Sequence, residues 1–274
     1  MEEDAGKLIH GDNLGSPGKS YVDFNRTGIP LVEIVSEPDL RSGEEAREYL
    51  TQLKSILEYA EVSDCNMEKG GLRCDANVSV RPEGQKEFGI RTETKNLNSF
   101  RFVQRAIEYE VDRQIKILTQ GDSVVQETRL YDSNKGVTFS MRSKEEAHDY
   151  RYFPEPDLVP VVINDEWIKE TKDSLPELPG QKKERFIQNY EIPEYDAGVL
   201  TVSRAIADFY EKSVLLYPKP KTLSNWIMGE LLRKLKSDAQ KIENCSIKPE
   251  DLTDLLKLID EGTISAKIAK TAFE

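Results

Sequence analysis

The sequence has few of the features that mark secreted, metal-clustered or membrane-spanning proteins. Its three cysteines, Cys65, Cys74 and Cys245, are odd in number and widely spaced, which favours neither a disulfide framework nor a zinc cluster and fits a reducing compartment. No apolar run approaches the length of a membrane span. The first seven residues resemble neither a signal peptide nor a transit peptide. We therefore expect a soluble protein of the cytoplasm, with a mitochondrial or plastid location left open and no membrane partner.

Positive charge is also in short supply. The 274 residues contain 38 Lys and Arg against 50 Asp and Glu, a formal net charge of −12. This excess argues against indiscriminate attraction of nucleic acid, although a local basic patch is compatible with it. The excess is uneven, because residues 1–164 hold 21 basic and 30 acidic residues, whereas residues 165–274 hold 17 and 20. The second part would tolerate a polyanion better.

The strongest pattern lies between residues 72 and 95, where polar and apolar residues alternate in two runs. Because successive side chains of a strand point to opposite faces, the runs 72–81 and 88–95 predict two strands, and Pro82-Glu-Gly84 supplies a turn between them. The polar face of this antiparallel hairpin would carry six candidate residues: Arg73, Asp75, Asn77, Arg91, Glu93 and Lys95. Two interpretations stay open, a binding face or a solvated face held by cross-strand ion pairs.

Another strand and two helices are expected around this hairpin. Residues 31–35 form an apolar run around Glu33, typical of a central strand whose single carboxylate either pairs with an arginine or faces a metal or a substrate. Ser42 caps one helix, and Ser99 caps a second one that Gly121 ends. The expected apolar stripe of the second helix comprises Phe100, Val103, Ile107, Val111, Ile115 and Leu118.

A second pair of alternating runs, residues 127–131 and 137–142, flanks a turn whose residues tolerate left-handed backbone. The polar faces carry Glu127 and Arg129 in the first run, and Thr138, Ser140 and Arg142 in the second. Together these elements predict an α+β architecture, in which helices cover the apolar side of an antiparallel sheet and a face of arginines and carboxylates is left open.

Residues 149–158 combine three aromatic residues, two prolines, Arg151 and three carboxylates. The prolines bias the residues before them to extended conformations, so a rigid extended segment is expected. It is either a packed connector or the wall of a binding site, in which Arg151 would be available for a phosphate or a carboxylate.

From about residue 165 the strand patterns stop and helical spacing takes over. Helices are expected over residues 178–190, 196–217, 222–237 and 249–260, and from Ser265 onward. Asp196 and Ser265 are expected caps, Pro249 fits a first helical turn and Gly262 a C-terminal stop. The basic flanks 182–185, 219–221 and 233–236 are expected to be exposed helix faces rather than nucleic-acid contacts. We therefore predict two domains, residues 1–164 and residues 165–274.

Several longer stretches together resemble one family. They are residues 1–7, residues 23–39, Leu72-Arg-Cys-Asp-Ala-Asn77, Lys95-Asn-Leu-Asn-Ser99 and Asp149-Tyr-Arg-Tyr-Phe-Pro-Glu-Pro-Asp157, followed by Leu223-Ser-Asn-Trp-Ile-Met-Gly229 and Gly262-Thr-Ile-Ser-Ala-Lys267. In this order they resemble the B subunit of the tRNA-dependent amidotransferases, the GatB family. The resemblance covers essentially the whole chain.

The resemblance implies an activity, cofactors and partners. The B subunit of this family uses ATP and Mg²⁺ to phosphorylate the side-chain carboxylate of misacylated Glu-tRNA(Gln) or Asp-tRNA(Asn). Ammonia, which the partner amidase (the A subunit) releases from glutamine, then displaces the phosphate, and the small C subunit braces the pair. The catalytic domain of the family is similar to that of glutamine synthetase, and the later helical domain faces the tRNA.

The chemistry of the open sheet face agrees with this activity. Activation of a carboxylate by phosphoryl transfer needs metal ions between phosphates and cations on the developing charge. Carboxylate and amide oxygens suit Mg²⁺, and Arg and Lys suit phosphates. The hypothesis assigns Glu2, Glu3 and Arg151 to catalysis, Arg73, Asn77, Arg91 and Lys95 to nucleotide contacts, and Glu3, Asp75 and Glu93 to metal binding. For the acidic pair at the start, a solvated tail is the alternative.

The chain departs from the family pattern at its ends. Complete members begin before Met1, with a segment that carries a Glu and a His near the metal site and, in some members, zinc-binding cysteines, and their tail domain continues past Glu274. We therefore expect the chain alone not to complete the reaction. Two other functions stay open, a non-catalytic tRNA-binding or assembly fragment, and an ATP-dependent ligase acting on a free amino acid.

Overall fold

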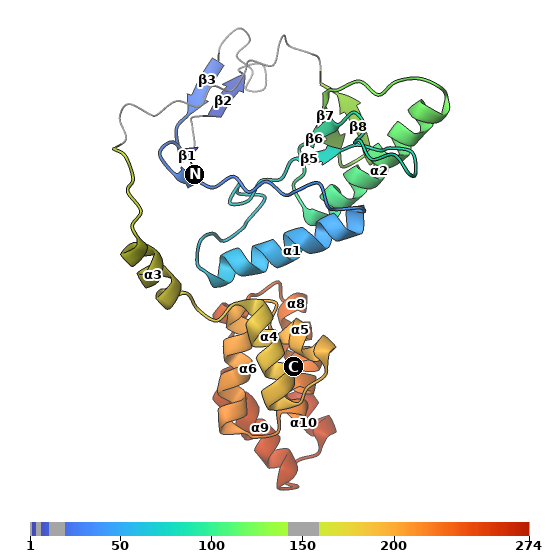
Figure 1. The fold of residues 1–274 in the computed structure, drawn as a ribbon. Coiled ribbons are helices and arrows are strands. Elements are labelled where there is room, and N and C mark those ends of the chain that lie inside the picture. The colour runs from blue at the N-terminus through green and yellow to red at the C-terminus, as the bar shows by residue number, and fades with distance from the viewer. Residues whose placement is uncertain (1, 4–6, 11–19, 142–158, 274) are drawn as a thin grey trace. The chain divides into compact units, whose positions relative to one another are not determined.

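A computed structural model describes residues 2–3, 7–10, 20–141 and 159–273 (Figure 1). The chain forms two compact units, residues 1–41 and residues 42–274. Among the described residues, no helix is both long enough and apolar enough to cross a bilayer. The three cysteines are free.

The first unit contains two short antiparallel ladders. Strand β1 (Glu2–Glu3) pairs with β4 (Pro30–Leu31), and β2 (Lys7–His10) pairs with β3 (Ser20–Asp23). The expected central strand over residues 31–35 is therefore wrong. Pairing ends at Leu31 and Glu33 is exposed, because no second strand of the described residues covers this run and its apolar neighbours are exposed as well.

The second unit begins with a sheet and two helices. The sheet has the order β5–β6–β7–β8, in which β5 is Ala76–Val78, β6 Thr92–Lys95, β7 Thr128–Asp132 and β8 Val137–Ser140. Helix α1 spans Gly43–Tyr59 and helix α2 spans Phe100–Thr119. Both expected caps are confirmed, since the Ser42 and Ser99 hydroxyls accept hydrogen bonds from the third residue after each (3.0 and 3.2 Å).

The pairing of the strands departs from the expectation at one place. The hairpin β5–β6 and the pair β7–β8 are antiparallel as predicted, but β6 and β7 are parallel, with Thr94 opposite Arg129. Helix α2 connects these two strands, and a helical crossover brings the chain back to the end of the sheet at which it started. The sheet is therefore mixed, and the α+β class is confirmed.

The faces of α2 and of the second strand pair differ from the prediction. The buried positions of α2 are Val103, Ala106, Glu110 and Gln114, whereas Ile115 and Leu118 are 47% and 41% exposed. This face packs on the sheet, where Arg129 and Thr138 are themselves buried. The expectation that these two residues lie on an open face is wrong, because the carboxylate of Glu110 meets them from α2.

The core between α1, α2 and the sheet is small. It consists of Leu50, Ala76, Leu97, Val103, Ala106 and Tyr131, with partly buried aromatic neighbours that include Phe100 and Phe102. Helix α1 packs on α2, and α2 packs on strands β5 and β8 (Figure 1). The strands thus have one side fixed by helix α2.

The rest of the second unit is helical, as predicted. Its helices are α3 (Asp165–Ser174), α4 (Pro179–Tyr190), α5 (Glu194–Leu200), α6 (Arg204–Leu216), α7 (Pro220–Trp226), α8 (Leu232–Ser237), α9 (Pro249–Asp260) and α10 (Ala266–Phe273). A π-helical turn, Ile227–Leu231, joins α7 to α8, and a 3₁₀ turn, Ile242–Asn244, precedes α9. A larger core fills the interior, with Phe186, Tyr210, Leu223, Ile227, Leu231 and Leu256 among its members.

Several expected helix ends in this part are confirmed. Pro249 is the first residue of α9, Gly262 has a φ of 75° just after it, and the Ser265 hydroxyl accepts a hydrogen bond from the Ile268 amide (3.3 Å). Asp196 was expected to cap a helix, but it lies inside α5, where its carboxylate accepts hydrogen bonds from Lys221 and Ser224. The expected helix over residues 196–217 is two helices.

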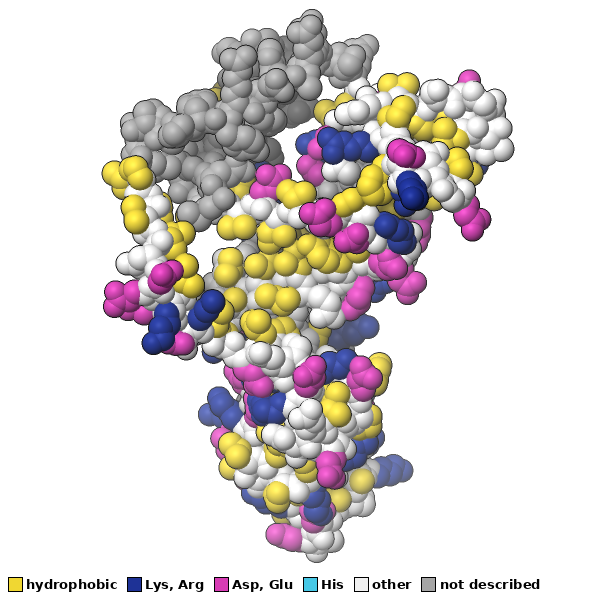
Figure 2. Space-filling view, in the orientation of Figure 1, with side chains coloured by type: hydrophobic (Ala, Val, Ile, Leu, Met, Phe, Trp, Pro, Cys, Tyr) yellow, Lys and Arg dark blue, Asp and Glu magenta, His cyan; other side chains and the backbone are white. Residues whose placement is uncertain are grey.

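Basic residues of the helical part are mostly engaged. Lys182, expected on an exposed face, is buried and contacts Asp208 and Glu211 at 3.2 and 2.9 Å. Other ion pairs join Arg185 to Glu177, Lys221 to Asp196, Lys219 to Asp260 and Lys270 to Glu230. Basic and acidic side chains are accordingly interspersed over this part (Figure 2).

Candidate active site on the sheet face

The candidate site is the sheet face that α2 leaves uncovered. Asn77 of β5 lies directly opposite Glu93 of β6, so their side chains share this face. The ammonium of Lys95 reaches the Asp75 carboxylate at 3.1 Å and the Glu93 carboxylate at 3.3 Å. Four of the six residues predicted for the polar face of the hairpin are thereby brought together.

Electrostatics favour the charged form of Lys95. Partial burial disfavours its positive charge, but the hydrogen bonds and attraction from Asp75 and Glu93 outweigh this effect and raise the pKa of Lys95 above its ordinary value. The three side chains keep between 34% and 47% exposure, so solvent and a ligand can reach them. This arrangement places one permanent cation between two carboxylates on an accessible surface.

The sequence did not reveal the contribution of β7. The hydroxyl of Thr128 donates a hydrogen bond of 2.8 Å to the second oxygen of Glu93. The parallel register, which sets Glu93 beside Thr128, creates this contact. Glu93 is therefore held from both sides, by Lys95 on its own strand and by a hydroxyl from the next strand.

The remaining predicted residues are placed less fully. Arg73 and Arg91 precede β5 and β6 and are exposed. Glu2 and Glu3 form β1, whose backbone is described and whose side chains are not. Arg151 lies outside the described residues. The proposed roles of these five residues stay predictions.

Three side chains of the sheet face carry oxygen atoms that could bind a metal ion. Asp75, Asn77 and Glu93 offer the carboxylate and amide oxygens that Mg²⁺ takes, which fits the predicted chemistry. Within the described residues, no group of three or more His, Cys, Asp or Glu side chains converges on one point. A complete metal site therefore needs at least one ligand beyond Asp75 and Glu93. In the structure, the carboxylates of both residues form ion pairs with Lys95.

A buried ion-pair network supports the face from beneath. Glu110 of α2 is fully buried, and its carboxylate accepts hydrogen bonds from Arg113 (2.8 Å), Arg129 (3.0 Å), Thr92 (2.9 Å) and Thr138. Burial alone would raise the pKa of Glu110, but the bonds from Arg113, Thr138 and Thr92 and the charge of Arg113 lower it below its usual value.

This network fixes the strand that carries the candidate residues. Thr92 immediately precedes Glu93, and its hydroxyl both donates to Glu110 and accepts a 2.9 Å hydrogen bond from Gln114. Gln114 also donates to the Val78 carbonyl of β5 (3.0 Å). The helical spacing of residues 103, 106, 110 and 114 indicates that they share one face of α2. Two of these residues are polar, so a search for apolar residues alone does not find this buried face.

Comparison with known proteins identifies the class. The family model of the GatB/GatE catalytic domain matches residues 1–169, and that of the GatB domain matches residues 208–274. The chain thus contains a catalytic domain of the GatB/GatE class.

Curated relatives refine this assignment. Over all of its 274 residues, the chain is 59% identical to the B subunit of the aspartyl/glutamyl-tRNA(Asn/Gln) amidotransferase of Carboxydothermus hydrogenoformans, and 58% identical to that of a Thermoanaerobacter species. It covers 57% of the length of each relative. The chain belongs to the GatB family.

Proposed function

We propose that the chain forms the carboxylate-activating part of an aspartyl/glutamyl-tRNA(Asn/Gln) amidotransferase. The observation that carries the proposal is the 57–59% identity to proteins of that name along the entire chain. The open face of charged residues supports it, because its residue types suit phosphoryl transfer to a carboxylate. The ligase reaction would convert Glu-tRNA(Gln) or Asp-tRNA(Asn) with ATP and with ammonia from glutamine.

We assign different roles to the residues of the sheet face. Lys95, with Arg73 and Arg91, would contact phosphate oxygens, and Asn77 would donate to the nucleotide. Asp75 and Glu93 are proposed ligands of Mg²⁺, and Glu3 is the third residue proposed for this role; the ion would supply positive charge to offset that of the phosphates. Glu2, Glu3 and Arg151 would act next to the reacting carboxylate.

The partners follow from the same proposal. Residues 1–164 would form the catalytic domain and residues 165–274 a helical domain that faces the tRNA. The partner amidase would deliver ammonia, and the small third protein of the assembly would brace the pair. ATP and Mg²⁺ are the proposed cofactors.

The test is an amidation assay with a full-length protein. The chain would be joined to the flanking segments of the Carboxydothermus hydrogenoformans relative and assembled with the partner amidase and the small third protein. We expect glutamine-dependent conversion of Glu-tRNA(Gln) or Asp-tRNA(Asn) that stops when ATP is omitted. Conversion without ATP, or none with either substrate, would contradict the proposal.

A second function competes for the same face. The ion pairs of Lys95 with Asp75 and Glu93 are also what a purely structural surface network would show, as in a tRNA-binding or assembly fragment. In that case tRNA binding would persist while amidation would not depend on Lys95.

A further inference from the structure

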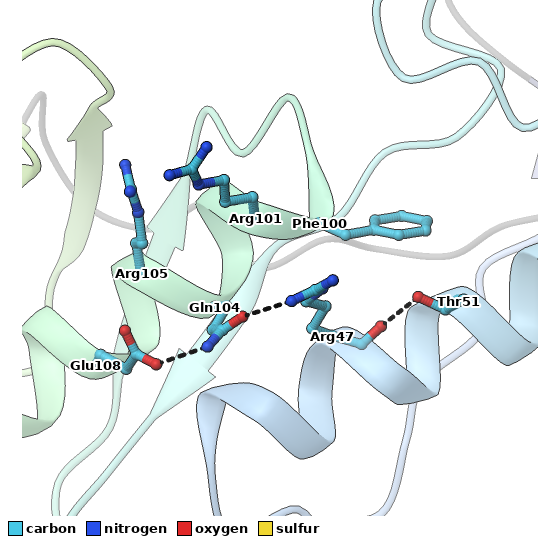
Figure 3. Close-up of a pocket in the computed structure, with 7 residues that line it drawn as sticks. All are labelled: Arg47, Thr51, Phe100, Arg101, Gln104, Arg105 and Glu108. Carbon is cyan, nitrogen blue, oxygen red and sulfur yellow. Dashed lines mark hydrogen bonds between the residues drawn. The ribbon is translucent and has the colours of Figure 1, made fainter. Parts of the chain in front are cut away.

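A second basic feature lies on the helical layer, away from the sheet face. An open groove of about 580 Å³ runs between α1 and α2 (Figure 3). Its lining comprises Arg47 and Thr51 of α1, and Phe100, Arg101, Gln104, Arg105 and Glu108 of α2. We refer to this feature as the arginine groove.

Close contact of the two helices shapes the groove. Gly43 is buried at the start of α1, and a Cβ there would lie 2.7 Å from the Gln104 carbonyl oxygen. On the groove floor, the Gln104 side chain accepts a hydrogen bond from Arg47 (3.4 Å) and donates one to Glu108 (2.9 Å). Glu108, the acidic residue of the groove, thus accepts its hydrogen bond from a neutral amide and not from an arginine of the groove.

The arginines of the groove are exposed, and no carboxylate of the described ranges pairs with them. Among the described residues, the side chains of Arg101 and Arg105 make no hydrogen bond or ion pair, and the guanidinium group of Arg47 bonds only to the neutral Gln104. In the helical part, by contrast, Lys182, Arg185 and other cations are held by carboxylates. In a chain of net charge −12, this concentration of unneutralised positive charge is unusual.

The placement of these residues suits a phosphodiester strand. Arg101 and Arg105 extend side by side from one face of α2 (Figure 3), four residues apart, which separates their Cβ atoms by about 5–6 Å. Arg101 lies in the first turn of α2, where the helix dipole also favours an anion. Guanidinium groups in a row can each contact one of a series of neighbouring phosphates.

We propose that the arginine groove binds the phosphate backbone of an RNA strand. This inference rests on the proposed function, because it assigns a tRNA contact to the helical layer of the catalytic domain, outside the residues of the sheet face. Arg101 and Arg105 contact phosphates directly, and Arg47 adds charge from the facing helix. Glu108 marks the end of the groove, since a carboxylate repels the backbone.

The test measures tRNA binding as a function of salt. The 274-residue chain, its Arg101→Gln and Arg105→Gln variants and the double variant would be titrated with unacylated tRNA(Gln) transcript between 50 and 200 mM KCl. Each lost phosphate contact lowers the salt slope by about one. The affinity ratio of wild type to each single variant should therefore shrink about three-fold across this range, and that of the double variant about ten-fold.

Two variants serve as matched controls. Lys116→Gln removes one exposed charge from the same helix α2, outside the groove, and should leave the salt slope unchanged. Arg105→Lys keeps the charge and should keep the slope. Melting temperatures within about 2 °C of wild type would show that the folds are intact.

The outcomes separate this inference from the proposed function. Absence of tRNA binding, or equal affinity and slope in wild type and double variant, would overturn the groove assignment, whereas the amidation assay still decides the proposed function. Tighter binding of polyglutamate than of tRNA, lost in the double variant, would also overturn it and indicate an acidic protein partner. Binding of inorganic phosphate alone, without a tRNA effect, would reduce the groove to a site for the free anion and overturn the RNA assignment.

Discussion

At the scale of single residues, the central feature is the buried carboxylate of Glu110. Its buried carboxylate joins α2 to three strands through Thr92, Arg129 and Thr138. Arg113 and Arg129 both pair with it, and Arg129 pairs with Glu127 as well. A buried charge is tolerated only when its partners are present, and removal of one partner leaves the others unsatisfied. Glu110 is therefore a structural requirement for the position of β6.

Glu110→Gln should lower the free energy of unfolding by roughly 3 kcal/mol, because Arg113 and Arg129 lose their shared counter-charge in a buried site. Urea unfolding at pH 7 measures this change. Glu108→Gln on the exposed face of the same helix is the matched control and should stay within about 0.5 kcal/mol of wild type. Equal effects of the two substitutions would contradict the role of the network.

The same carboxylate gives a pH dependence. The pKa of Glu110 is lower in the folded chain than the ordinary unfolded value of about 4.3, so the unfolded state binds the proton more tightly. Its contribution to stability is complete above that value and is lost as the pH falls through the folded pKa. The difference in unfolding free energy between wild type and Glu110→Gln should therefore shrink between pH 5 and pH 3, and a constant difference would refute this explanation.

At the scale of elements, α2 shows what the sequence could and could not reveal. The cap at Ser99 and the stop at Gly121 are local signals, and the helix spans Phe100–Thr119 as expected. Its buried face could not be found by counting apolar residues, because Glu110 and Gln114 face partners that come later or earlier in the chain. Alternation likewise located the strands but carried no information on the direction of the β6–β7 pair.

The candidate site was predictable to a similar degree. Alternation placed Asp75, Asn77, Glu93 and Lys95 on one face, because a hairpin fixes the register of its two strands. Thr128 could not be placed there, since its neighbour in the sheet depends on the parallel crossover. The arginine groove was missed because its residues come from two helices whose facing sides depend on tertiary packing.

The crossing of α1 and α2 depends on Gly43. Gly43→Ala should destabilise the chain by about 1–3 kcal/mol, because the new methyl group would lie 2.7 Å from the Gln104 carbonyl oxygen and the helices would have to separate. Gly180→Ala in the first turn of α4 is the control, since nothing lies within 4 Å of its Cβ position, and it should be neutral or stabilising by up to about 1 kcal/mol. Thermal and urea unfolding would measure the stability of both variants. An unchanged stability of Gly43→Ala would contradict the close contact between α1 and α2.

At the scale of the whole molecule, the sheet-bearing part and the helical part of the second unit are joined through α1. The buried Tyr59 hydroxyl donates to the Thr201 carbonyl oxygen at 3.0 Å, and the Ser55 hydroxyl donates to Val202. Burial, followed by the charges of Asp208 and Glu211, raises the pKa of Tyr59 above its usual value, so the hydroxyl keeps its proton. These two hydrogen bonds join α1 to the segment between α5 and α6.

Tyr59→Phe should cost about 1–3 kcal/mol in unfolding free energy, because the Thr201 carbonyl would lose a buried donor. Tyr49→Phe, in the same helix α1, is the control, because it removes a hydroxyl from a half-buried tyrosine. It should change the free energy of unfolding little. Urea unfolding monitored by circular dichroism compares the two, and equal stabilities would show that the joint contributes nothing.

The measurement that tests the central claim most directly is amidation with Lys95 replaced. In the complete assembly with the partner amidase and the small third protein, Lys95→Gln should reduce ATP-dependent conversion about 100-fold or more, because the cation between Asp75 and Glu93 is lost from the reaction site. Its stability should change by no more than about 1 kcal/mol, since these ion pairs are exposed. Lys116→Gln, the control, should retain full activity. A Lys95→Gln enzyme within about three-fold of wild type would show that the charged sheet face is a structural ion-pair network and that activation occurs elsewhere.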